Sequence, residues 1–319
     1  MKYYIKYALK YQMIHQILHS FKKKRINFFI DLQSIAKGFY NKQVVLVEIG
    51  RYATEGKISG ILIEELREFL NTLYLQFKIY DPFFILFYDD GVCRQQTAID
   101  STYKQGSKID LIVDQDNVEL FKQIKKHYFK EIEEKFNKKD LSKVYYLKEY
   151  EADFIPYYCI VNNFYDSFDS DILNIIISVD KDLLQCCEFV NTIQCITSFV
   201  PTQEGRFQIQ FNNYDRDNAI EYIHKTLKRG ILSAKYIPMI LAIAGDKADE
   251  ITGIKKGIGP KHAFDLIVDY SIPYTLDALR IELNNMPDVI KDNFKKLERN
   301  FKMISFEEQI KRIPKHAYF

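Results

Sequence analysis

Three short apolar runs, each followed by an aspartate, constrain the fold of this 319-residue chain more than any other feature. Residues 27–30 lead to Asp31, residues 83–88 lead to Asp89 and Asp90, and residues 172–179 lead to Asp180. The run over residues 83–88 is continuous, which is typical of a strand that is covered on both faces, and the other two are also expected to be buried strands. Helical patterns lie between them, the strongest over residues 58–77, and another begins near Tyr150. A helix is also expected over residues 237–244, a hairpin over residues 192–200 and 206–211, and either a second strand or the start of a loop at residues 44–47. The sequence therefore predicts an α/β fold with a mostly parallel central sheet and helices on both faces, followed by a helical C-terminal region.

The aspartates at the strand ends mark a candidate metal site, because ligands of such sheets bind beyond the carboxyl ends of the strands. The chain offers further acids of the same kind, namely Glu151, Asp153, Asp182, Asp246 and Asp249. Hard divalent cations such as Mg²⁺ take oxygen ligands. Paired metal ions also activate water and neutralise charge during phosphodiester hydrolysis. Crowded carboxylates repel one another unless cations are present, so the group predicts bound metal. Any one of these aspartates could instead simply cap a helix.

Residues 244–263 join a carboxylate pair to a glycine-rich turn. Asp246 and Asp249 are expected on one helical turn, where residues three apart face the same way. Glycines and lysines then alternate before the next helix, at Gly253, Lys255, Lys256, Gly257, Gly259 and Lys261. A glycine-rich turn before a helix N-terminus exposes backbone N–H groups that can hold a phosphate. The combination suggests a nuclease, and the alternative is an ordinary helix–loop–helix with solvated charges.

The composition excludes several other classes of protein. Hydrophobic residues make up 47% and charged residues 28% of the chain, which is typical of a globular protein. No apolar run reaches the roughly 18 residues that a membrane span needs, and we expect a cytoplasmic protein. The five cysteines lack metal-site spacing, which argues against a zinc ribbon. Residues 1–25 are basic and contain no acid, which favours an arm that contacts a polyanion.

Five segments of the chain resemble the flap-endonuclease and 5′-nuclease superfamily. They are Phe29-Ile30-Asp31-Leu32-Gln33-Ser34, Tyr150-Glu151-Ala152-Asp153, Ser178-Val179-Asp180-Lys181-Asp182-Leu183-Leu184-Gln185, residues 244–263, and residues 297–306. The last segment is similar to the tail of phage RNase H-type 5′ nucleases. The resemblance implies a helix–three-turn–helix at residues 244–263. Departures are Glu250, Thr252 and one extra lysine in that motif, and Phe154 where the family has a fourth acid.

The resemblance also implies roles for individual residues. One metal would be held by Asp31, Asp89 (or Asp90), Glu151 and Asp153, and a second by Asp180 and Asp182, with Asp246 and Asp249 nearby. Phe154 replaces one acid, which leaves the occupancy of the second site open. Arg94 and Lys104 would hold the scissile phosphate, and the charged stretch at about 105–147 would form an arch. The glycines and lysines of residues 253–261 would hold duplex DNA, and the same turn would bind K⁺ through backbone carbonyls.

From these expectations the sequence predicts a structure-specific, metal-dependent 5′ nuclease, encoded by a phage and active in primer removal. Its substrates would be DNA with a 5′ flap or single-stranded 5′ end and RNA–DNA hybrids, in the cytoplasm of an infected bacterium. Mg²⁺ is the expected cofactor, with Mn²⁺ as an alternative, and recruitment by a single-stranded-DNA-binding protein stays open. The expected organisation is a basic arm (1–25), an α/β core (26–244) and a C-terminal region (245–319). Two alternatives remain, a DNA-binding scaffold with weak or no catalysis and an RNase of the related PIN class.

Overall fold

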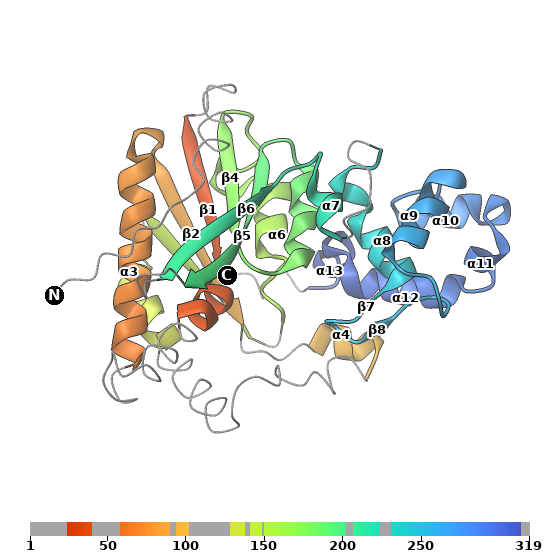
Figure 1. Ribbon diagram of the computed structural model, residues 1–319, viewed down its shortest axis with the longest axis horizontal. Coiled ribbons are helices and arrows are strands. Elements are labelled where there is room, and N and C mark those ends of the chain that lie inside the picture. The colour runs from red at the N-terminus through yellow and green to blue at the C-terminus, as the bar shows by residue number, and fades with distance from the viewer. Residues whose placement is uncertain are drawn as a thin grey trace.

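The computed structural model describes residues 24–39, 58–89, 94–101, 128–137, 141–148, 150–201, 207–223 and 231–313. Within this part of the chain, a six-stranded sheet forms the centre, in the order β3-β2-β1-β4-β5-β6 (Figure 1). The strands are β1 (Arg25–Asp31), β2 (Pro82–Asp89), β3 (Ser142–Leu147), β4 (Ile172–Ile177), β5 (Thr192–Pro201) and β6 (Phe207–Tyr214). The first five strands in this order are parallel and β6 is antiparallel to β5. The expected mostly parallel sheet is confirmed.

Alternate side chains of each central strand pack on opposite faces of the sheet. In β1, Phe28 and Ile30 belong to one core cluster and Phe29 to another. The first cluster lies under α3 (Ile58–Phe77) and the helical residues 32–39, and the second under α6 (Ile155–Val161) and α13 (Phe306–Ile310). Helices therefore cover both faces, as expected from the apolar runs.

The β3 edge of the sheet was not predicted. Ser142–Leu147 pairs in parallel with β2, and the helical residues 128–136 before it bury Tyr128 and Ile132 in the first core cluster. These segments fall inside the stretch expected to form an arch. They pack on the sheet because their apolar side chains are spaced to face it, despite the many lysines and acids between them. Residues 105–127 and 138–140, which belong to the rest of the proposed arch, lie outside the described part of the chain.

The C-terminal region is helical. It contains η5 (Ala234–Tyr236), α8 (Ile237–Ala244), α9 (Pro260–Asp269), α10 (Leu276–Glu282), η6 (Leu283–Asn285), α11 (Asp288–Lys291) and α12 (Phe294–Ile304). These helices share one core cluster, in which α12 packs against α8. Figure 1 shows them beside the sheet. α4 (Arg94–Ile99) contacts α12, and β7 (Gly245–Asp246) and β8 (Ile251–Thr252) pair in a short antiparallel hairpin.

Two local expectations were wrong. A helix was expected to begin near Tyr150, but α6 begins at Ile155, because the peptide N–H of Ile155 closes a turn onto the Ala152 carbonyl. Asp246 and Asp249 do not share a helical turn. Instead α8 ends before Gly245, whose positive φ of 85° turns the chain into the β7–β8 hairpin. Residues 44–47, which could be a second strand or the start of a loop, lie outside the described residues.

The described part of the chain also contains the shorter elements η2 (Lys78–Tyr80), η3 (Phe164–Asp166), η4 (Lys181–Glu188) and α7 (Ala219–Ile223). Among the described residues, no helix combines the length and the apolar character needed to cross a membrane.

Candidate metal centre

Asp31 is fixed at the carboxyl end of β1 by a cage of hydrogen-bond donors. Its side chain accepts from the backbone N–H groups of Gln33 (2.9 Å) and Ser34 (3.1 Å), from the Ser34 hydroxyl, and from the Ser178 hydroxyl (2.7 Å). Burial raises the pKa of Asp31, the bonds from Ser34 and Ser178 partly offset this, and the negative charge of Asp89 raises it again. A buried carboxylate held in one orientation beside a second carboxylate is suited to bind a cation.

Asp89 ends the neighbouring strand β2 and binds the turn that carries the next two acids. Its Oδ2 accepts from the backbone N–H of Ala152 at 2.9 Å, and its Oδ1 accepts from the Gln33 side-chain amide at 2.7 Å. Ala152 lies between Glu151 and Asp153, so this bond places both acids at the end of the sheet. Asp90, the alternative ligand, lies outside the described residues.

Asp153 lies at the centre of the acidic group. Burial raises its pKa well above the usual value, and the charges of Asp180, Asp31, Glu151 and Asp89 raise it further, in that order. All the acids in this group come from the carboxyl ends of β1, β2, β3 and β4 or from the turns that follow. The structure therefore brings together the expected first set, Asp31, Asp89, Glu151 and Asp153.

Asp180 and Asp182 stand at the start of η4. Asp180 caps this helix by accepting from the Asp182 backbone N–H at 2.8 Å, and its own N–H donates to the Ser178 hydroxyl at 3.0 Å. Ser178 thus bonds to both Asp31 and Asp180. It joins the first group of acids to the second.

The second group is compact. One carboxylate oxygen from each of Asp182, Asp246 and Asp249 lies within 4.8 Å of the other two. Asp182 comes from η4, which follows β4, and Asp246 and Asp249 come from the β7–β8 hairpin. Although the helical expectation was wrong, the hairpin presents both of its acids to the same point.

Two oxygens of this group have no hydrogen-bond partner among the described residues. They are Asp182 Oδ1 and Asp246 Oδ2, and both are buried. Burial and the charges of Asp180, Asp249 and Asp246 raise the pKa of Asp182 well above its usual value. Unpaired buried oxygens and mutual repulsion both cost free energy that a divalent cation would offset. The donor set, which is oxygen only, fits such a cation.

Lys181 is a positive charge inside this group that the sequence did not single out. Its ammonium donates to Asp246 Oδ1 at 2.6 Å. Burial works against the charged form, but the charges of Asp182, Asp246 and Asp249 hold the pKa of Lys181 above its usual value. Gln33, Ser34 and Ser178 were also missed as supports of the acids. Their positions directly after the ends of β1 and β4 were the sequence feature that could have identified them.

Phe154 lies where the family pattern has a fourth acid. Its side chain is almost fully buried in the core cluster under α6. The position therefore serves packing in this chain and adds no ligand to the acids.

The glycine-rich loop runs from the hairpin into α9. A Cβ on Gly253 would lie 2.4 Å from the Ala244 carbonyl oxygen, so only glycine fits there, and Gly257 has a positive φ of 91°. Lys255, Lys256 and Lys261 are exposed, and Lys261 pairs with Asp265 at 2.8 Å. Gly259 precedes α9, which begins with Pro260.

The two residues proposed to bind the scissile phosphate, Arg94 and Lys104, lie wholly or partly outside the described part of the chain. Arg94 begins α4, but its side chain lies outside what the structure describes, and Lys104 lies outside the described residues altogether.

Comparison with solved structures identifies the architecture. The chain is similar to the bacteriophage T5 flap endonuclease, in a structure of a pseudo-enzyme–product complex with DNA and metal ions, with a TM-score of 0.61 and 13% identity over 88% of this chain and 89% of that one. It is also similar to the T5 5′-exonuclease with bound zinc, with a TM-score of 0.58 and 14% identity over 88% and 89% of the two chains. This chain has the flap-endonuclease fold. No protein-family model and no curated protein matches the sequence itself.

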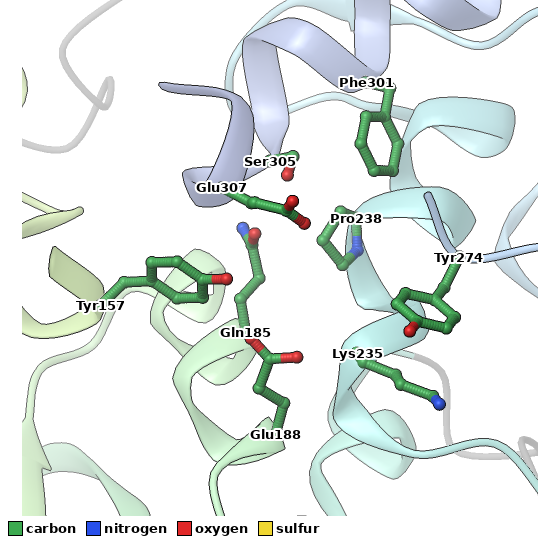
Figure 2. Close-up of a pocket in the computed structure, with 9 residues that line it drawn as sticks. All are labelled: Tyr157, Gln185, Glu188, Lys235, Pro238, Tyr274, Phe301, Ser305 and Glu307. Atoms are coloured by element: carbon green, nitrogen blue, oxygen red, sulfur yellow. The ribbon is translucent and has the colours of Figure 1, made fainter. Parts of the chain in front are cut away.

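The flap-endonuclease fold of this chain also contains a hollow away from the acids. Its lining residues include Tyr157, Glu188, Lys235 and Tyr274. Figure 2 shows Tyr157 and Glu188 on one side of it and Lys235 and Tyr274 on the other. None of the acids proposed as metal ligands lines it, so the hollow is separate from the candidate metal centre.

Proposed function

We propose that this protein is a metal-dependent 5′ nuclease that cuts DNA at 5′ flaps and from 5′ ends. The observation that carries the proposal is the acidic group at the carboxyl edge of the sheet, above all the compact set of Asp182, Asp246 and Asp249 with its unpaired buried oxygens. The flap-endonuclease fold supports it, because the same architecture binds DNA and metal ions in the T5 enzyme.

In this proposal the two sets of acids hold two divalent ions. Asp31, Asp89, Glu151 and Asp153 would hold the first, and Asp180, Asp182, Asp246 and Asp249 the second. The ions would activate water and neutralise charge on the phosphodiester. Ser34 and Ser178 keep Asp31 in one orientation through the hydrogen bonds described above. Arg94 and Lys104 would bind the scissile phosphate, where a cation stabilises developing negative charge.

The C-terminal region would hold the duplex part of the substrate. Lys255, Lys256 and Lys261 are exposed around the loop of Gly253, Gly257 and Gly259. Backbone N–H groups before α9 can donate hydrogen bonds to a phosphate. Such contacts position a duplex without reading its sequence. We assign this loop to a helix–three-turn–helix between α8 and α9, with K⁺ bound to its carbonyls.

The finer parts of the proposal follow the family resemblance. They are Mg²⁺ as the usual metal, primer removal in phage DNA replication inside an infected bacterium, cleavage of RNA in RNA–DNA hybrids, and recruitment by a single-stranded-DNA-binding protein. The basic arm (1–25), the core (26–244) with an arch, and the C-terminal region (245–319) would be its functional parts.

A second candidate function is a DNA-binding scaffold with weak or no catalysis. The observation in its favour is the burial of Phe154, which removes one acid of the family pattern. The remaining acids converge nonetheless, so we favour the enzyme.

A cleavage assay separates the two. A 5′-labelled flap duplex is incubated with Mg²⁺, with Mn²⁺ and with EDTA, using the wild type, Asp180→Asn and the exposed control Asp269→Asn. We expect metal-dependent cutting near the junction by the wild type and the control. Asp180→Asn should lose more than the roughly hundredfold that removal of an outer-shell partner costs, with duplex binding retained. Full activity in Asp180→Asn would refute the metal assignment, and tight binding without cutting in either metal would favour the scaffold.

A further inference from the structure

The side chains of Arg299 and Asn300 connect two segments that belong to the candidate site but are far apart in the sequence. One is the β7–β8 hairpin, which carries Asp246 and Asp249. The other is α4, which follows β2 and begins at Arg94. Both residues lie on α12, in the helical C-terminal region (Figure 1).

Asn300 closes the base of the hairpin. Its side chain is fully buried, and its Nδ2 donates to the carbonyl oxygens of Ala242 and Thr252, each at 2.9 Å. Ala242 lies in the last turn of α8, where carbonyl groups lack helical partners, and Thr252 ends the hairpin. Asn300 therefore pairs with one carbonyl group on each side of the segment that holds Asp246 and Asp249. These two hydrogen bonds fix the distance between the two ends of that segment.

Arg299 extends this connection to α4. Its guanidinium donates from Nη2 to Asn300 Oδ1 at 3.1 Å, and its Nη1 lies 3.2 Å from Asp100 Oδ2. Asp100 directly follows α4, and Ile99, the last residue of that helix, packs against the core cluster that contains α8 and α12. The Asp100 side chain is only 19% exposed, so the pair is screened less than one on the open surface.

We propose that Arg299 is a positioning residue for the nuclease site. Through Asp100 and Asn300 it holds α4 in register with the hairpin, so that the start of α4 and the carboxylates of Asp246 and Asp249 keep a fixed relation. This inference rests on the proposed function for its effect on cleavage, but the structural connection itself can be measured without a substrate.

The test compares Arg299→Met, which keeps the apolar stem but removes every donor, with Arg299→Lys and with Lys295→Met. Lys295 is an exposed residue of the same helix, so its variant controls for the loss of one positive charge. Hydrogen exchange of residues 94–101 and single-turnover cleavage of the flap duplex are measured for each, together with duplex affinity in Ca²⁺.

We expect Arg299→Met to speed exchange in residues 94–101 and to lower the single-turnover rate by about ten- to a hundredfold, since a misplacement of about 1 Å can cost that much. Duplex affinity should stay within about twofold of the wild type because the glycine-rich loop is untouched. Arg299→Lys should recover part of both effects, and Lys295→Met should show neither.

Each outcome bears on one of the two proposals. Unchanged exchange in a folded Arg299→Met protein would overturn the positioning role. A rate that falls only in step with thermal stability, or an equal loss in Lys295→Met, would overturn it as well. If the wild type does not cut at all, the proposed function fails, while faster exchange in Arg299→Met would still establish the connection.

Discussion

The backbone N–H of Ala152 donates to Asp89 Oδ2 over 2.9 Å, and this bond ties the turn after β3 to the end of β2. Without this bond, the positions of Glu151 and Asp153 would be set only by the local turn that contains them. With it, a carboxylate proposed as a ligand also fixes the position of its neighbours. The acids therefore form one structural unit, and changes to one of them are expected to disturb the others.

Metal-free protein should lose stability as the pH rises. The pKa of Asp153 is raised in the folded state by burial and by its acidic neighbours, as are those of Asp31 and Asp182. A folded-state pKa above the ordinary 3.8 means that the folded protein binds more protons than the unfolded chain above that pH. The stability that these three acids contribute is thus fully present below about pH 4. It is lost as the pH rises through their raised folded-state pKa values. Other groups that titrate in this range add their own slopes, so the diagnostic quantity is the difference between metal-free and metal-loaded protein.

Thermal unfolding in EDTA and in Mg²⁺ across pH 4–8 checks this expectation. Mg²⁺ should raise the midpoint temperature of unfolding more at pH 8 than at pH 5. At pH 8 a larger fraction of the acids is ionised, so their mutual repulsion is stronger and the bound cation relieves more of it. Asp153→Asn should reduce this pH dependence in EDTA. A Mg²⁺ effect that is the same at both ends of the range would contradict the metal assignment.

Gly253→Ala should destabilise the junction between the hairpin and the loop. The added Cβ would meet the Ala244 carbonyl oxygen at 2.4 Å, and backbone must move to relieve it. Overpacking of this kind costs about 1–3 kcal/mol. Urea unfolding measures the loss, and the affinity for labelled duplex should fall with it. Gly259→Ala is the matched control, since a Cβ there meets nothing within 4 Å. Equal effects of the two substitutions would show that the close approach is not what requires glycine.

Gln185→Leu should weaken the attachment of the C-terminal helices to the core. The buried Gln185 amide donates to the Ile304 carbonyl and accepts from the Phe306 N–H, each over 3.1 Å. Leucine fills similar space but leaves the Phe306 N–H without this partner, which costs about 1–3 kcal/mol for a buried group. The Ile304 carbonyl keeps only the longer hydrogen bond from Gln309 Nε2, at 3.4 Å. Urea unfolding should show a lower free energy of unfolding, whereas the exposed Asn285→Leu should stay within about 0.5 kcal/mol of the wild type. A Gln185→Leu protein as stable as that control would show that water replaces the amide.

Sequence patterns predicted the strands that are buried on both faces, β1, β2 and β4, and also the β5–β6 hairpin. β1, β2 and β4 are mostly apolar, although β1 contains the buried Asn27 and β4 the buried Asn174. The helices α3 and α8 match their predicted bounds. β3 was missed because it is an edge strand, in which Lys143 is partly exposed and Tyr146 is exposed, and it lies among charged residues. Pattern alone does not separate such a strand from a charged loop.

The acids of the site could be predicted because parallel strands bring their carboxyl ends to one edge. The local geometry of Asp246 and Asp249 could not, since it depends on Gly245 ending α8 and on the pairing of two very short strands. The supports also escaped prediction. Ser178 and Lys181 are ordinary polar residues in the sequence, and their partners lie on other strands or on the distant hairpin.

The strand order β3-β2-β1-β4 has a consequence for how the protein acquires its site. Asp31, Asp89, Asp153 and Asp180 are separated by long stretches of chain and meet only when four parallel strands are aligned. Contacts of such high sequence separation form slowly, and their charges repel one another only once they have formed. A divalent cation therefore has no assembled partner early in folding. Bound metal should therefore lower the unfolding rate and leave the folding rate nearly unchanged. The folded state should last longer with metal than without it.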